Sequence, residues 1–277
     1  MAEYPKVEAD KSRGLAFKKA VSLKKAFNIH RGDIISLVGA GGKTALMLAL
    51  AKELAAAGES VITTTTTKIL DWQASETCLI LETDEEKMLN LLRQELKKHR
   101  HITLASQRLL DEGKLKGISP ELVARLAELG QIAYIIIEAD GAARKPLKAP
   151  NATEPVIPQN TSLVIPIVGI DALGSRLNRE NVFRPEIVSR LTGLPLGGII
   201  SADAITTLMT HTEGIIKGSP AHARITPLIN KMDLAQGLAT AENLASKILE
   251  RRHPQIERVV LGQVQFPEPV VEVIQAI

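Results

Sequence analysis

Short continuous apolar runs alternate along this chain with longer segments whose apolar residues recur every three or four positions. The continuous runs predict strands buried on both faces, as in a parallel sheet, and the periodic segments predict amphipathic helices. Strands are expected at 33–38, the first half of 61–68, 78–81, 133–138, 162–169, 224–229 and 256–264. Helices are expected at 15–28, 44–57, 84–100, 120–130, 184–191, 202–210 and 235–251.

This alternation predicts an α/β protein: one three-layer α/β/α domain over residues 1–277 with a mainly parallel sheet. Two segments fall outside the alternation. The charged residues 1–14 are expected to be flexible. Residues 102–118 are expected to form a small β-hairpin insertion that turns at Asp111-Glu112-Gly113.

A glycine loop separates the first long helix from the strand before it. Glycines let a backbone approach a phosphate closely, and the N–H groups at a helix start attract the anion. The lysine that follows can reach β- and γ-phosphates, and the threonine hydroxyl can ligate Mg²⁺. This context predicts a nucleotide-binding loop in a P-loop NTPase-like fold. The expected nucleotide contacts are Gly39, Ala40, Gly41, Gly42, Lys43 and Thr44.

The loop is shorter than the common phosphate-loop pattern, which has a glycine six residues before the lysine, where this chain has Leu37. The resulting G-x-G-G-K-T form is similar to the short loop of ATP-dependent Mur-type ligases. An ordinary glycine turn followed by a solvated lysine is the alternative. The agreement of strand, paired glycines, Lys-Thr and helix at one place favours nucleotide binding.

Two carboxylates, Glu138 and Asp140, stand at the carboxyl end of the apolar run 133–137. In phosphate-loop enzymes this position holds the acidic residue that organises Mg²⁺. Both side chains lie on the same side of an extended backbone, so one is expected to ligate the metal or its water and the other to orient a nucleophile. The alternative is a strand that simply ends at the polar surface.

The threonine run 63–67 suits an extended backbone, which is the simplest interpretation. However, strand carboxyl ends face the ligand crevice of a nucleotide-binding fold. Thr66, Thr67 and Lys68 are therefore also candidates to meet Mg²⁺-bound water or the γ-phosphate, with Thr66 as the expected metal contact.

A proline-rich loop, 144–158, leaves directly from the expected metal site. Its cations Arg144, Lys145 and Lys148 are candidates to neutralise phosphate charge, as arginine fingers do, with Arg144 as the expected catalytic member. A surface loop with solvated charges explains the same residues equally well.

The tetrapeptide Asn230-Lys231-Met232-Asp233 matches the N-K-x-D pattern of GTPase base-recognition loops. In such loops the aspartate accepts hydrogen bonds from the guanine edge, and the lysine stem lies over the ring. The asparagine, lysine and aspartate are therefore expected base contacts. Because no clear second base loop is found near 260–263, guanine is only favoured, and GTP and ATP both remain candidates.

Composition narrows the functional classes. Aromatic residues make up 3% of the chain, and 34 basic against 31 acidic residues give a net charge of +3, so a nucleic-acid partner is not expected. The single cysteine, Cys78, excludes an intrachain disulfide and fits a reducing cytoplasm. The polar N-terminus and the short apolar runs predict neither a signal peptide nor a spanning helix. We therefore expect a cytoplasmic protein without a membrane partner.

Together these motifs resemble the selenium-dependent hydroxylase accessory proteins of the YqeC-like family. The residues that carry the resemblance are 37–44, 63–68, 138–141, 146–150, 154–158, 216–218 and 230–233. The resemblance implies a P-loop NTPase fold and a role in maturing a molybdenum hydroxylase that carries labile selenium. It therefore implies such a hydroxylase, or its maturation factors, as partners.

Three functions are compatible with these observations. One is an Mg²⁺-dependent NTPase, or a nucleotide-gated accessory factor, that works by positioning and charge stabilisation. Another is an ATP-dependent ligase or kinase acting on a small molecule, which the short loop favours. A third is a nucleotide switch without hydrolysis. For the NTPase, the expected catalytic residues are Lys43, Glu138, Asp140 and Arg144, and the expected metal contacts are Thr44, Thr66, Glu138 and Asp140.

Overall fold

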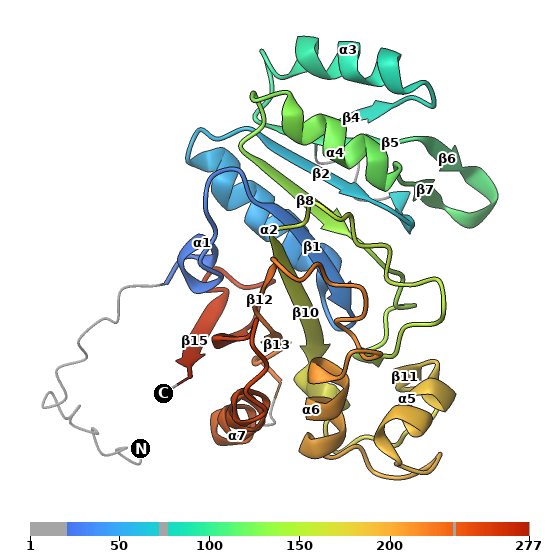
Figure 1. Cartoon of the computed structure of the whole chain (residues 1–277), viewed down its shortest axis with the longest axis vertical. Coiled ribbons are helices and arrows are strands. Elements are labelled where there is room, and N and C mark those ends of the chain that lie inside the picture. Colours follow the sequence, from blue (N-terminus) through green and yellow to red (C-terminus); the bar gives the residue numbers. More distant parts are fainter. Residues whose placement is uncertain (1–20, 72–76, 235–236, 277) are drawn as a thin grey trace, which may run out of the picture.

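The computed structural model describes residues 21–71, 77–234 and 237–276, and a ten-stranded sheet forms its centre (Figure 1). The strands of this sheet are β1 (Ile34–Gly39), β2 (Val61–Thr65), β4 (Cys78–Leu81), β5 (His101–Ala105), β8 (Tyr134–Glu138), β10 (Leu163–Gly169), β12 (Arg224–Ile225), β13 (Leu228–Asn230), β14 (Arg258–Gly262) and β15 (Val270–Gln275). Their order is β15-β14-β13-β10-β1-β8-β2-β5-β4, with β12 also paired to β10. The β14–β15 pair is antiparallel, and the other described pairs of this sheet are parallel. The predicted α/β class with a mainly parallel sheet is confirmed.

Helices cover both faces of the sheet and complete three layers. They are α1 (Leu23–Ala26), α2 (Lys43–Ala56), α3 (Glu85–Glu95), α4 (Pro120–Glu128), α5 (Pro185–Thr192), α6 (Ala202–Thr210) and α7 (Leu238–Glu250). Successive strand residues serve opposite layers: Ile35 packs in the cluster of α1 and α2, and Ile34 in that of α3 and α4. None of the helices in the described ranges combines the length and apolar character that a bilayer crossing requires.

The predicted hairpin exists but is narrower than 102–118. Residues 101–105 form β5 of the central sheet, because Ile102 and Leu104 pack beneath α3 and α4. The hairpin itself joins β6 (Gln107–Leu109) to β7 (Lys114–Lys116), and β3 (Lys68–Leu70) adds a third antiparallel strand. A second small sheet pairs β9 (Leu147–Lys148) with β11 (Val182–Phe183).

Several predicted boundaries are wrong for local reasons. The strand expected at 224–229 is split into β12 and β13 by Thr226-Pro227, because proline has no N–H to donate to a ladder. The helix expected at 84–100 ends at Glu95. The edge strand β15 was not predicted, and its sequence Val-Val-Glu-Val-Ile-Gln lacks the strict apolar–polar alternation that indicates a half-buried strand. Residues 1–14 and part of the basic helix at 15–28 lie outside the described residues.

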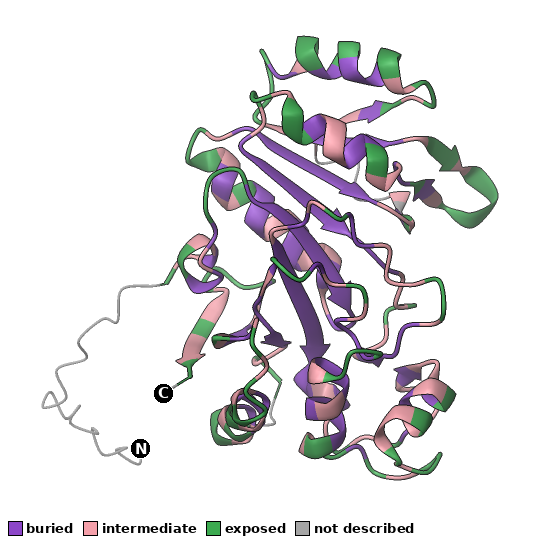
Figure 2. Ribbon diagram, viewed as in Figure 1, coloured by how far each residue is buried: buried purple, intermediate pink, exposed green. Residues whose placement is uncertain are grey.

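The central strands of the sheet are fully buried. Every residue of β1, β8 and β10 is buried, and Figure 2 shows these strands as the most continuous buried stretch of the molecule. Charged side chains at the carboxyl ends of these strands therefore lie beside a low-dielectric core, where unpaired charges are costly.

Gly117 fixes the hairpin to the threonine run. Its N–H donates to Thr67 O (2.9 Å), and the next N–H, of Ile118, donates to Thr65 O (2.9 Å). A Cβ on Gly117 would lie 1.7 Å from Thr65 O, so only glycine permits this approach. The position of the hairpin therefore depends on this residue.

We predict that Gly117→Ala lowers the free energy of unfolding by about 2–3 kcal/mol, because the added methyl group meets backbone rather than a movable side chain. Gly141→Ala is the matched control, since a Cβ there meets nothing within 4 Å, and it is expected to change stability by less than about 1 kcal/mol. Urea denaturation of both variants measures the difference. Equal stability of the two variants would contradict the proposed attachment.

Candidate functional site

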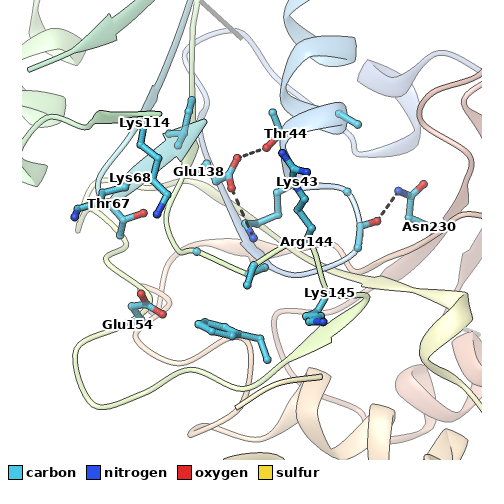
Figure 3. A pocket seen from close by; sticks show the side chains of 18 of the residues that line it. Lys43, Thr44, Thr67, Lys68, Lys114, Glu138, Arg144, Lys145, Glu154 and Asn230 are labelled. Atoms are coloured by element: carbon cyan, nitrogen blue, oxygen red, sulfur yellow. Dashed lines mark hydrogen bonds and ion pairs between the residues drawn. The ribbon is translucent and has the colours of Figure 1, made fainter. Parts of the chain in front are cut away.

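The carboxyl ends of the parallel strands meet at one edge of the sheet, where α/β proteins bind ligands. β1 lies between β8 and β10, and the chain crosses from one side of β1 to the other after β8. Such a change of direction leaves a crevice beside the switch point. A cavity of about 1260 Å³ lies here, and Figure 3 shows the side chains that line it. Seven of its lining residues are Lys or Arg and two are Glu, so it suits a polyanion.

The glycine loop, Gly39–Thr44, needs its glycines for packing as well as for any ligand. Gly41 and Gly42 have φ values of +89° and +136°. A Cβ on Gly41 would lie 2.2 Å from Gly169 N at the end of β10. The N–H groups of Gly41 and Gly42 donate no hydrogen bond to any described residue, and those of the first turn of α2 have no intrahelical acceptor. These groups are therefore available to a phosphate.

Lys43 begins α2, and its side chain is 3% exposed. Its Nζ donates to Gly39 O (2.6 Å) and lies 3.3 Å from Asp140 Oδ1 and 3.8 Å from Glu138 Oε1. The ammonium group thus lies inside the curve of the glycine loop beside both predicted carboxylates. The structure brings together residues that the sequence predicted from two motifs far apart in the chain.

Thr44 and Glu138 meet directly, because the Thr44 hydroxyl donates to Glu138 Oε2 at 2.7 Å (Figure 3). Burial raises the pKa of Glu138, against the opposing effects of Lys43 and the Thr44 hydrogen bond. A hydroxyl and a carboxylate are hard oxygen donors, which Mg²⁺ prefers. The pair fits a Mg²⁺ ion that uses one or two protein ligands and completes its shell with water and phosphate.

Asp140 lies behind this pair rather than in the cavity lining. Its carboxylate accepts from Gly39 N (3.1 Å) and pairs with Lys148 Nζ (2.8 Å) as well as with Lys43. With a side chain only 2% exposed, it holds the glycine loop against β8. The structure thus gives the two predicted carboxylates different positions: Glu138 faces the cavity, and Asp140 supports the loop.

Lys148 was predicted either to neutralise phosphate or to be solvated, and the structure shows neither. Its side chain is fully buried in β9, where Nζ contacts Asp140, Gly141 O (2.6 Å) and Glu154 (3.1 Å). Glu154 also pairs with Arg184 at 2.7 Å. Burial acts to raise the pKa of Glu154, but Arg184 and Lys148 together hold it below its ordinary value. One sign of this network is visible in the sequence, a lysine between apolar neighbours in Leu147-Lys148-Ala149.

The remaining candidates from the proline-rich loop and the threonine run lie around the cavity and differ in whether their side chains already have a partner. Arg144 lines it, is exposed, and makes no ion pair with the part of the chain that the structure describes. Lys145 donates to Glu180 O (2.6 Å). Thr66 also lines the cavity, but its hydroxyl donates to Val156 O (2.6 Å), so that proton is committed to the proline-rich loop.

The N-K-x-D residues occupy three different environments. Asn230 is buried: its Nδ2 donates to Gly41 O (2.8 Å), and its Oδ1 accepts from Val264 N (3.1 Å), which links the glycine loop to the end of β14. Lys231, at φ +66°, pairs with Asp171 (2.7 Å) and lines the cavity. Asp233 is exposed and does not line it. The structure therefore places Asn230 and Lys231 at the site and Asp233 beside it.

Comparison with known proteins places this arrangement in a family. The family model described as YqeC protein matches residues 35–186. An Escherichia coli (strain K12) protein named "Uncharacterized protein YqeC" is 31% identical over 236 residues, which cover 85% of this chain and 89% of that protein. The chain belongs to the YqeC family. The resemblance inferred from the motifs is thereby confirmed at the level of family membership.

The region that matches the YqeC family contains the glycine loop and both strand-end carboxylates. Residues 35–186 include the glycine loop, Glu138, Asp140 and the ion-pair network of the buried Lys148 with the half-buried Glu154 and Arg184. The segment 230–233 follows the matched range and is not part of it. Within this YqeC family member, the buried ion network and the glycine loop therefore belong to the same matched unit.

We predict that Lys148→Met lowers the free energy of unfolding by about 3 kcal/mol or more, because it removes the cation shared by the buried Asp140 and the half-buried Glu154. Lys145→Met is the matched control in the same loop. That lysine is half-exposed and makes one hydrogen bond, so its loss is expected to cost about 1 kcal/mol or less. Thermal and urea denaturation compare them. Similar costs would show that the network does not hold this part of the fold.

Proposed function

We propose that this protein binds a nucleoside triphosphate with Mg²⁺ in the cavity and hydrolyses its terminal phosphate. One observation carries the proposal: a Lys-Thr pair at a helix start after a glycine loop, with the lysine between two strand-end carboxylates and the threonine bonded to one of them. Phosphate, metal and catalytic groups then share one low-dielectric corner, where fixed charges act strongly on a developing phosphate charge.

Each residue has a role that follows from its position. The free N–H groups of the glycine loop bind the β-phosphate, and Lys43 turns from Gly39 O to the β- and γ-phosphates. Thr44 and Glu138 hold Mg²⁺, which neutralises phosphate charge. Asp140 holds the glycine loop and the Lys43 side chain in position through its contacts with Gly39 N and Lys43 Nζ. Arg144, exposed at the cavity wall, is the candidate to stabilise charge on the transferred group.

The base is expected on the Asn230 side of the loop. Asn230 orients the loop through Gly41 O and reaches the β14 end through Val264 N. Lys231 provides an alkyl stem at the cavity wall, and Asp233 requires a local movement to reach a guanine edge. Both GTP and ATP are therefore tested, with GTP favoured by the N-K-x-D pattern.

The proposed biological role rests on the family resemblance. We propose that nucleotide binding or turnover drives an accessory step in the maturation of a selenium-dependent molybdenum hydroxylase in the cytoplasm. A hydroxylase or one of its maturation factors would then stimulate phosphate release. A non-hydrolysing nucleotide switch is the competing outcome, and it predicts binding without turnover even when that partner is present.

We predict that the wild type binds ATP or GTP in a Mg²⁺-dependent manner and that Lys43→Ala weakens binding about 100-fold or more, because a lysine–phosphate contact in a buried site contributes several kcal/mol. Calorimetry with each nucleotide, with and without Mg²⁺, measures this. Asp233→Ala, assayed in parallel, is expected to weaken GTP binding alone if the base lies over Lys231.

Lys52→Ala is the control for this experiment, since Lys52 is exposed on the same helix. Its nucleotide affinity should match the wild type. Thermal denaturation of Lys43→Ala separates lost binding from lost folding. A folded wild type that binds neither nucleotide in the presence of Mg²⁺ would refute the proposed function.

We predict that Mg²⁺-dependent nucleotide affinity falls as the pH is lowered through the raised pKa of Glu138, because protons compete with the metal for its carboxylate. One proton gives a slope of about tenfold per pH unit below that pKa. The stability contributed by Glu138 has the opposite pH dependence: it is fully present below the unfolded-state pKa and is lost as the pH rises through the folded-state pKa.

Calorimetric titrations from about pH 5 to pH 8 test this dependence. Glu138→Gln is expected to bind Mg²⁺–nucleotide weakly and with a flat pH profile. A steep profile that persists in Glu138→Gln would assign the titration to another group.

A further inference from the structure

The small antiparallel sheet forms one wall of the cavity and presents lysines to it. Lys68 of β3 and Lys116 of β7 are direct partners in the register, so their side chains share one face. Lys114 lies two positions before Lys116 and therefore shares that face as well. The intervening pair, Ile69 and Leu115, is buried, at 4% and 1% exposure. All three lysines line the cavity.

This arrangement is unfavourable without a ligand, because like charges directly opposite each other on neighbouring strands repel. Lys68 and Lys114 share one acidic partner, Glu112, at 2.6 and 3.2 Å. Lys116 is exposed and makes no ion pair among residues 21–71, 77–234 and 237–276. The carboxylate of Glu112 therefore pairs with two of the three lysines, and the face has capacity for a further anion at Lys116.

The wall is held rigidly next to the metal site. Gly117 N and Ile118 N donate to Thr67 O and Thr65 O, and Thr65 Oγ1 donates to Glu138 O at 2.6 Å. The lysine face is thus attached to the end of β2, the strand that pairs with the one carrying Glu138. Figure 3 shows Lys68 and Lys114 on one side of Lys43 and Asn230 on the other.

The cavity has room beyond a nucleotide. Its volume of about 1260 Å³ exceeds the roughly 300–1,000 Å³ typical of small-molecule sites. With the base toward Asn230 and the terminal phosphate at Lys43, Thr44 and Glu138, the lysine face lies past the γ-phosphate. This is the place from which an acceptor would approach.

From these observations we infer that the face of Lys68, Lys114 and Lys116 binds an anionic second substrate, a small molecule with a carboxylate or phosphate group, and presents it to the γ-phosphate. The inference rests on the proposed nucleotide site. In the transfer, an acceptor oxygen forms a bond to the γ-phosphorus while the bond from that phosphorus to the β–γ bridging oxygen breaks. The electron pair leaves with the nucleoside diphosphate, and the product is the phosphorylated anion.

Calorimetry on nucleotide-loaded protein tests the subsite. The protein is saturated with Mg²⁺ and a non-hydrolysable triphosphate analogue, and succinate or inorganic phosphate is titrated into it at constant ionic strength. We expect at least one anion to bind and Lys116→Gln to weaken its binding about tenfold, because a charge-assisted hydrogen bond is lost. Binding of succinate alone assigns a carboxylate acceptor, and binding of phosphate alone assigns a phosphorylated one.

Two controls make the result specific. Lys116→Gln should retain nucleotide affinity within about twofold and should melt no lower than the wild type, since it relieves repulsion with Lys68. Lys52→Gln, at an exposed lysine outside the cavity, should behave as the wild type.

The outcomes separate the two proposals. If nucleotide binds but neither anion does, or if anion binding is insensitive to Lys116→Gln, the acceptor subsite is overturned and the nucleotide site stands. Phosphate binding that vanishes when nucleotide is loaded also overturns it, because the anion then occupies the glycine loop. If no nucleotide binds to the wild type, both proposals fail.

Discussion

The site depends on three interactions of the Asp140 carboxylate. It accepts the Gly39 N–H, pairs with Lys43 from α2, and pairs with Lys148 from β9. These partners come from the end of β1, the following helix and the proline-rich loop, so one buried carboxylate joins three segments of the chain. Because it holds the glycine loop from behind, the cavity side of that loop stays free for a ligand.

A buried charge cluster of this kind contributes little net folding free energy, but it fixes which side chains meet and at what distance. Desolvation of Asp140, Lys148 and Glu154 offsets most of their mutual attraction, so apolar residues of similar shape would hold the fold as well. The charges instead require particular partners at particular distances. Arg184 extends this requirement to α5 through Glu154, and stacks on Phe183 at 4.4 Å from the ring centroid. The region after β10 is thereby tied to the loop.

Sequence patterns predicted the parts of the fold and site that depend on local rules. Continuous apolar runs predicted β1, β8 and β10 almost to the residue, because strands buried on both faces leave no other pattern. A shorter apolar run predicted the partly exposed edge strand β4. The glycine loop and Glu138 were predicted as site residues from their residue types and strand-end positions, and the structure places both at the cavity. What the sequence did not reveal depends on tertiary partners. The sequence left Lys148 either as a cation that neutralises phosphate or as a solvated loop cation, and its pairing with Asp140 and Glu154 is evident only from the structure.

Two further features depend on distant neighbours in the same way. Asn230 stays a predicted base contact, and only the structure reveals that its side-chain amide also links Gly41 O to Val264 N. The hairpin limits were also misjudged, because Ile102 and Leu104 resemble hairpin residues unless the helices that cover them are known. Each of these features is set by a neighbour that no local window contains.

The site is polarised along the sheet edge, and this polarity has a structural origin. Asn230 ties the glycine loop to β13 and β14 on one side, whereas Thr65 and Gly117 tie Glu138 to β2 and the small sheet on the other. The first side has a neutral amide and an ion-paired lysine, and the second has an excess of cations. The glycine loop lies between these two sides of the cavity, so the two ends of a molecule that spans the cavity would meet different side chains. The fold therefore gives the cavity two chemically different ends, which is the basis for the direction proposed for the nucleotide.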